Sequence, residues 1–150
     1  SQVVSFTRGA KMIRDAEANG HHVIVEYLGH MFPYELQGAG RPHWQVSPKY
    51  RMDATIPDGL SKGDVVLFLQ YQQFPWDFAT AMQAIGVQSI ITSSMKPMDH
   101  WATDADIIYI NPFWEVQDAA VDVPGYDVRI LPTSGIMQSV VYWQLVGLTK

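Results

Sequence analysis

The fold is decided by the stretch Asp64-Val65-Val66-Leu67-Phe68-Leu69, in which five consecutive apolar residues follow a single carboxylate. A continuous apolar run of this length is typical of a strand that is covered on both faces, as in the centre of a parallel sheet. Shorter β-branched runs lie on either side of it, at residues 22–28, 89–92 and 107–110, and a weaker one lies at 44–46. The sequence therefore predicts five strands.

Helical spacing of apolar residues precedes or separates several of these strands. It is found at residues 5–19, ending at Asn19-Gly20, and at residues 76–85, between Pro75 and Gly86. This alternation predicts right-handed crossovers and a mostly parallel sheet with helices on both faces. The expected fold is thus a three-layer α/β sandwich.

Three further segments complete the expected organisation of a single domain spanning residues 1–150. Residues 33–37 can form a short helix, and residues 118–130 are expected to form a hairpin-like excursion at the edge. The last helix begins after Pro132-Thr133-Ser134. It is too apolar all round for a lone surface helix, so we expect it to be buried against the sheet or against a second subunit.

Composition excludes several classes of function. The 150 residues are 47% apolar and 17% charged, with ten Lys+Arg against fifteen Asp+Glu, which gives a net charge of −5. This balance argues against nucleic acid as a partner, because such binding depends on surplus positive charge. The chain has no cysteine, and it has no apolar run of the roughly 20 residues that a membrane span needs. We expect a cytoplasmic domain with neither a nucleic-acid nor a membrane partner.

In a parallel sheet, ligands collect beyond the carboxyl ends of the strands. The segments expected there are polar and uncharged apart from one histidine, and they suit a hydroxylated ligand such as a sugar. They are Leu28-Gly29-His30-Met31, Gln70-Tyr71-Gln72-Gln73, Thr92-Ser93-Ser94, Asn111-Pro112-Phe113-Trp114 and the helix start Thr133-Ser134. The nucleotide-binding, hydrolase-elbow and zinc-helix motifs are missing, and the five histidines have no metal-site spacing. We therefore expect no cofactor and no metal.

Three residues are candidates for proton transfer. His30 directly follows a glycine that ends a strand, and Glu35 lies on the short helix after the same strand. Glu26 lies within that strand, where burial would suit a general base. Each has a structural alternative: His30 as a residue that holds its turn, Glu35 as a capping or solvent-facing residue, and Glu26 as a strand-edge or loop-paired side chain.

The order of several motifs resembles that of sugar isomerase (SIS) domains, a phosphosugar-binding family. The resemblance covers residues 5–148 and depends on order and spacing rather than on any single motif. The matching stretches are Gly29-His30, Glu35-Leu36, Gly38-Ala39-Gly40, Gly63-Asp64-Val65-Val66, Ile90-Ile91-Thr92-Ser93, Ala105-Asp106-Ile107-Ile108-Tyr109-Ile110-Asn111, Asp118-Ala119-Ala120-Val121, Pro124-Gly125 and Pro132-Thr133-Ser134.

The resemblance implies a flavodoxin-like, Rossmann-like five-stranded sheet that binds a sugar or sugar phosphate, usually as a dimer or larger homo-oligomer. It implies an aldose–ketose isomerase, with Glu35 or His30 moving the proton, or else a non-catalytic sugar sensor or a structural subunit of a larger assembly. Two loops depart from the family. Met31 stands where the related branch has serine, and the loop from Gln70 to Pro75 lacks the hydroxyl cluster that holds phosphate. Weaker phosphate binding is therefore expected, with Gln72 and Gln73 bonding a neutral sugar instead.

Overall fold

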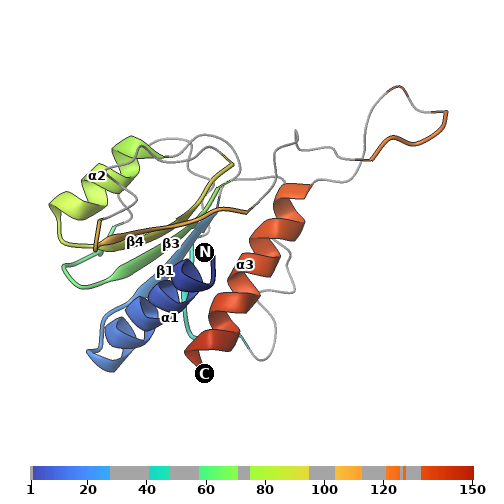
Figure 1. Cartoon of the computed structure of the whole chain (residues 1–150). Helices are drawn as coiled ribbons and strands as arrows, with labels where there is room; N and C mark the ends of the chain where they lie inside the picture. The colour runs from blue at the N-terminus through green and yellow to red at the C-terminus, as the bar shows by residue number, and fades with distance from the viewer. Residues whose placement is uncertain are drawn as a thin grey trace.

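The computed structural model describes residues 2–27, 41–47, 58–70, 75–94, 104–112, 121–125, 127 and 133–150. These residues form a single parallel sheet with helices on both sides (Figure 1). The predicted helix at 33–37 and most of the predicted hairpin at 118–130 lie outside the described residues. A turn at Pro124-Gly125 is described, with Gly125 at φ 89°.

The sheet has five strands, and every neighbouring pair is parallel. The strands are β1 (Val23–Tyr27), β2 (Gln45–Val46), β3 (Val65–Leu69), β4 (Gln88–Thr92) and β5 (Ile107–Ile110). Their order across the sheet is β2-β1-β3-β4-β5. This is the strand order of the flavodoxin-like fold, so the predicted fold class is confirmed.

Three helices cover the two faces of the sheet. Helix α1 (Gln2–Ala18) and helix α3 (Thr133–Thr149) lie together on one face, and α2 (Trp76–Ala84) lies on the other (Figure 1). The three predicted helices are thus confirmed. Helix α1 begins three residues before its predicted start, because Gln2, Val3 and Val4 continue the helix although they add no buried residue to it.

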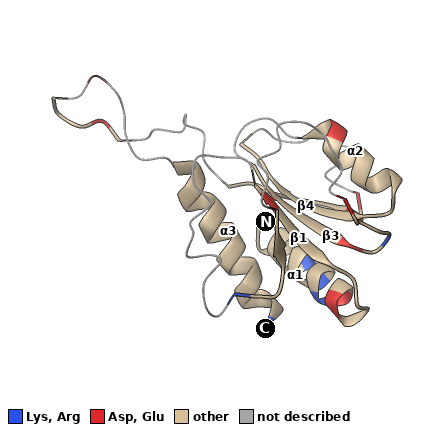
Figure 2. Ribbon diagram, turned by 180° about the vertical axis from the view of Figure 1, so that it is seen from behind, with Lys and Arg blue, Asp and Glu red and all other residues tan. Residues whose placement is uncertain are grey.

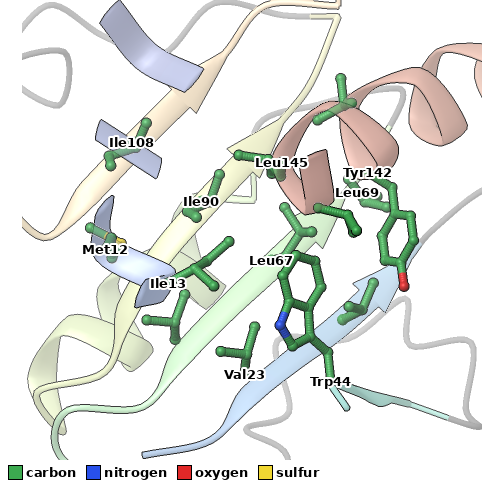
Figure 3. Packing of buried hydrophobic residues seen from close by; sticks show 14 of the residues in the cluster. Met12, Ile13, Val23, Trp44, Leu67, Leu69, Ile90, Ile108, Tyr142 and Leu145 are labelled. Carbon is green, nitrogen blue, oxygen red and sulfur yellow. The ribbon is translucent and has the colours of Figure 1, made fainter. Parts of the chain in front are cut away.

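The core consists of two apolar clusters, one on each face of the sheet. On the α1 and α3 side, Ile13 and Leu145 reach Leu67 and Ile90 of the central strands (Figure 3). On the α2 side, Phe68 stacks on Phe78, with ring centroids 4.6 Å apart and planes 18° from parallel. Because alternate residues of β3 enter opposite clusters, all five of its residues are buried, as its continuous apolar run predicted.

Two glycines allow helices to turn into strands. Gly20 follows α1 with φ 75°, and Gly86 follows α2 with φ 74°, the left-handed conformation that side chains other than glycine rarely adopt. Each turn reverses the direction of the chain after the helix, so that β1 and β4 enter the sheet in the same direction. Within the described ranges, none of the helices has the length and apolar character that crossing a membrane requires.

Candidate functional site

The carboxyl ends of the strands share one edge of the sheet, and the chain diverges there between β1 and β3. From β1 the chain continues to β2 on one side, whereas β3, β4 and β5 follow one another on the other side. In open parallel sheets this divergence leaves a crevice that binds ligands. The predicted ligand-binding residues that the structure describes are Gln70, Thr92, Ser93, Ser94, Thr133 and Ser134, and all six belong to this edge.

Gln70 and Thr92 join the ends of β3 and β4. The backbone N–H of Gln70 donates to the carbonyl of Thr92 at 3.2 Å and to its hydroxyl at 3.1 Å. The Thr92 hydroxyl also lies 3.1 Å from the carbonyl of Gln70, to which it can donate. The Thr92 side chain is therefore occupied by the neighbouring strand, and we assign it a structural role at the rim.

The Gln70 side chain differs from that of Thr92. Gln70 is only 7% exposed, and its Oε1 has no hydrogen-bond partner among the described residues. A buried amide oxygen without a partner costs about 1–3 kcal/mol, so its presence calls for a reason. A ligand donor at this edge of the sheet would satisfy it.

Glu26 lies beside Gln70 on the same face of the sheet. It is the fourth residue of β1, is 1% exposed, and pairs in register with Phe68 of β3. Strand β3 ends at Leu69. Continuing the alternation of side chains by one residue past this end places Gln70 diagonally across from Glu26, on the α2 side of the β1–β3 junction. A carboxylate and an amide thus lie buried together where the chain diverges.

Ser93, Ser94 and Tyr109 continue the edge toward β5. The hydroxyl of Tyr109 donates to the carbonyl of Ser93 at 2.8 Å, and Ser93 is buried. Burial raises the pKa of Tyr109 to about 12, so its phenol is neutral at physiological pH. This hydrogen bond holds the backbone of Ser93 just after the end of β4, and Ser94 follows it in the chain.

The first turns of α3 lie against the end of β3. Gln138, which is buried, donates from Nε2 to the carbonyl of Leu69 at 3.3 Å. Ser134 lies one turn earlier on the same side of the helix and is also buried, while Thr133 has a buried Oγ1 without a partner among the described residues. The N–H groups that open this 17-residue helix therefore lie at the same edge as Gln70 (Figure 1).

Other predicted site residues lie outside the described residues. These are Gly29, His30, Met31, Glu35, Gln72 and Gln73, so their roles, including the catalytic roles of Glu35 and His30, stay predictions. Two residues that the sequence reasoning passed over belong to the site: Gln138 and Tyr109. The signal for Gln138 was a polar residue four positions after Ser134 in a mostly apolar helix, whereas nothing in the sequence distinguished Tyr109 from a packing aromatic.

Among the residues that the structure describes at this edge, Glu26 is the one acidic side chain and the others are neutral. The basic residues with described contacts bond elsewhere: Arg8 donates to the carbonyl of Asp104 at 3.1 Å, Lys11 pairs with Asp15, and Arg14 bonds the carbonyl of Leu148. Among the described residues, no group of three or more His, Cys, Asp or Glu side chains could hold a metal ion. The chemistry available here is hydrogen bonding by amides, hydroxyls and Glu26.

The two histidines before β1 belong to the opposite edge of the sheet. His21 lies between α1 and β1, with Nδ1 3.8 Å from Oδ1 of Asp64, and the backbone N–H of His22 donates to the same oxygen at 2.8 Å. Both therefore belong to the turn between α1 and β1. They take no part in the carboxyl edge.

Comparison with known proteins adds no name to this geometry. A scan against protein-family models finds none that matches the chain, and a search of curated proteins finds no match either. The function of this chain is therefore inferred from its own residues.

Proposed function

We propose that the chain binds a sugar or a sugar phosphate at the carboxyl edge of its sheet, in the crevice between β1 and β3. The observation that carries the proposal is the buried Gln70 amide oxygen, which lacks a partner among the described residues and lies beside the buried Glu26. Both groups accept hydrogen bonds, and the hydroxyls of a sugar are donors of that kind. The SIS resemblance, a cytoplasmic location and a homo-oligomeric assembly belong to the same proposal.

The balance of charges favours a neutral sugar over its phosphate ester. Glu26 is an acid at the crevice, and the basic side chains with described contacts bond elsewhere. A phosphate would therefore depend on the N–H groups and hydroxyls that open α3, at Thr133 and Ser134. We expect neutral sugars to bind at least as well as their phosphates.

Calorimetric titration of the full chain with neutral pentoses and hexoses and with their phosphate esters tests the proposal. We expect binding heat with at least one neutral sugar, and Gln70→Leu should weaken that binding by about tenfold or more because a buried hydrogen bond is lost. The matched control is Gln88→Leu at the amino end of β4, where the side chain bonds Asp106 far from the crevice. It should bind as the parent does.

Stability separates a binding role for Gln70 from a structural one. Because the Gln70 amide oxygen has no partner among the described residues, its removal should leave the free energy of unfolding of the ligand-free chain unchanged or higher. If Gln70→Leu instead lowers the free energy of unfolding markedly, Gln70 has a structural role. If none of the sugars or phosphate esters gives binding heat, the proposed function is wrong.

An aldose–ketose isomerase is the second candidate, favoured by the presence of a carboxylate at the crevice. Such an enzyme removes the proton from one of two adjacent carbons and returns a proton to the other, so it needs a base and no redox group. Glu26 is the described candidate, and Glu35 and His30 are those predicted from sequence. Deuterium entering a carbon-bound position of a sugar or sugar phosphate in heavy water would support it, whereas binding without exchange supports a sugar sensor or a structural subunit.

A further inference from the structure

Helix α3 exposes apolar side chains on the face that points away from the sheet. Ile136 is 48% exposed, Val140 44% and Trp143 40%. Together with Gly147 they recur at intervals of four, three and four residues, which places them in one line along the helix. We call these four residues the outer stripe.

The outer stripe lies opposite the face by which α3 joins the core. The buried residues Ser134, Gln138, Val141 and Leu145 follow the same spacing, shifted by two positions along the chain. Two positions correspond to about 200° around a helix, so the two lines lie on opposite sides. Helix α3 therefore carries no charge on either side and has apolar side chains both inward, at Val141 and Leu145, and outward, which is typical of a helix that is covered on both sides.

Helix α1 provides an internal comparison. It has the same length as α3, lies on the same face of the sheet, and carries five exposed charged residues on its solvent side: Arg8, Lys11, Arg14, Asp15 and Glu17. Figure 2 shows blue and red on α1, whereas α3 is tan throughout its length. The outward surface of α1 is thus suited to water, and that of α3 is not.

We propose that the outer stripe of α3 is the contact surface of a homodimer, covered by the outer stripe of a second copy of this chain. Charge supports this occupant: each copy carries a net charge of −5, so two copies repel each other on average, and an uncharged face such as that of α3 lets them approach with the least repulsion. Its lack of charge also gives it nothing with which to select a charged partner. A two-fold pairing of identical stripes satisfies both copies at once.

The exposed apolar surface extends beyond the outer stripe. Beside the stripe runs an apolar groove of about 400 Å³ between the start of α1 and the end of α3, lined by Val3, Phe6, Gln144 and Leu148 among others. Val3 and Leu148 are 72% and 48% exposed, so the apolar surface continues across both helices. A patch of a few hundred Å² is of the size that often marks an interaction site, and a standard interface adds a polar rim to reach roughly 800 Å² on each partner.

Gly147 lets the two helices approach closely. A Cβ at this position would have no atom within 4 Å, so the space beside it is open in the single chain. Packed helices lie about 8–10 Å apart, and small residues at the crossing allow the shorter distances. We expect the two-fold axis to pass close to Val140, with Gly147 leaving space for the partner two turns further along the helix.

Sedimentation equilibrium of the full chain measures the association directly. We expect a species of twice 16.9 kDa that dissociates on dilution from about 200 to about 1 µM. Val140→Glu should weaken the dimer by about 100-fold or more, because the two-fold axis brings two like charges into one apolar contact. Ile85→Glu is the matched control: Ile85 is 37% exposed at the end of α2, on the other face of the sheet, and its substitution should leave the dimer intact.

A cross-link locates the contact independently of the energetics. Because the chain has no cysteine, Val140→Cys introduces a single thiol that can form a disulfide only with another copy. Mild oxidation should give a covalent dimer rapidly with Val140→Cys and slowly with Ile85→Cys, since a disulfide needs Cα atoms within about 7 Å. Circular dichroism of each variant checks that the monomer is folded.

Two results would overturn the proposal. One is a parent chain that stays monomeric at about 200 µM, which would leave the stripe to a different partner. The other is a dimer that Val140→Glu leaves unchanged while circular dichroism shows a folded variant, which would place the contact on another face.

Discussion

Asp64 stabilises the amino edge of the sheet by accepting three hydrogen bonds. Its carboxylate is fully buried and accepts from the backbone N–H of His22 at 2.8 Å and from the N–H and hydroxyl of Ser61 at 2.7 and 3.1 Å. Burial by itself would raise the pKa of Asp64, but the hydrogen bonds from His22 and Ser61 outweigh it and hold that pKa below its ordinary value. The residue that opens the central strand thus ties β3 to the start of β1.

We predict that Asp64→Ala lowers the free energy of unfolding by about 3 kcal/mol, because two backbone N–H groups lose a charged acceptor. Urea unfolding followed by circular dichroism measures the change. Asp58→Ala, on an exposed turn, serves as the control and should stay within about 0.5 kcal/mol of the parent. An Asp64→Ala chain as stable as the control would contradict this account.

Gly63 and Gly20 form a matched pair for a second prediction. Both have positive φ, 95° and 75°, so alanine is strained at either position. A Cβ at Gly63 would in addition overlap the imidazole of His21, whereas a Cβ at Gly20 would meet nothing within 4 Å. We expect Gly20→Ala to cost about 1 kcal/mol and Gly63→Ala about 1 kcal/mol more.

A double-mutant cycle identifies the source of the difference. In a His21→Ala background the imidazole is gone, so Gly63→Ala should cost no more than Gly20→Ala does. Thermal unfolding of the six chains measures each value. A difference that persists without the imidazole would mean that the backbone, and not His21, makes Gly63 necessary.

At the scale of elements, Trp44 connects the edge strand β2 to both helices on its face. Its Nε1 donates to Oε1 of Glu17 in α1 at 2.8 Å, and its ring meets Tyr142 of α3 edge-on, with centroids 5.6 Å apart. Trp44 is buried although β2 itself has only two residues. The position of β2 therefore depends on this one side chain more than on the pairing of β2 with β1.

We predict that Trp44→Phe lowers the free energy of unfolding by about 1–2 kcal/mol, through the lost hydrogen bond and the smaller ring. Glu17→Gln keeps the acceptor oxygen and should change it by less than about 0.5 kcal/mol. Denaturant titration of both variants gives the comparison. If Trp44→Phe is as stable as the parent, then the pairing with β1 holds β2 in place without Trp44.

Sequence patterns located these elements well because strands and helices impose short periods on apolar residues. The run at 65–69 matches β3 residue for residue, and the weak strand at 44–46 corresponds to β2 with Trp44 beside it. The start of α1 was misplaced because Val3 and Val4 are exposed and carry no periodic signal. Local periodicity reports burial, so it is silent where a helix end lies in solvent.

For the whole molecule, the range of pH over which the fold persists should be limited by two residues at opposite edges of the sheet. Because the folded pKa of Asp64 is depressed, its contribution is complete above the unfolded value of about 3.9 and is lost as the pH falls through the folded pKa. Because the folded pKa of Tyr109 is raised to about 12, its contribution is complete below about 10 and is lost as the pH rises toward 12.

Urea midpoints measured across the pH scale check both limits. We expect a loss of stability below about pH 4 that Asp64→Asn removes, and a loss above about pH 10 that Tyr109→Phe removes. Each variant should leave the other limb unchanged, since the two side chains lie at opposite ends of the strands. An acid limb identical in the parent and in Asp64→Asn would assign it to other carboxyl groups.

The sequence by itself determined that this chain forms a parallel sheet between helices, because the spacing of apolar residues is fixed locally by the geometry of strands and helices. It also singled out Gln70, Ser93 and Ser134 as polar residues at the ends of elements. Only the tertiary structure decided that Glu26 lies beside Gln70, that Gln138 reaches Leu69, and which side of α3 faces outward. Those relations join residues far apart in the chain, and they depend on strand order and helix rotation, which the packing of the complete core sets.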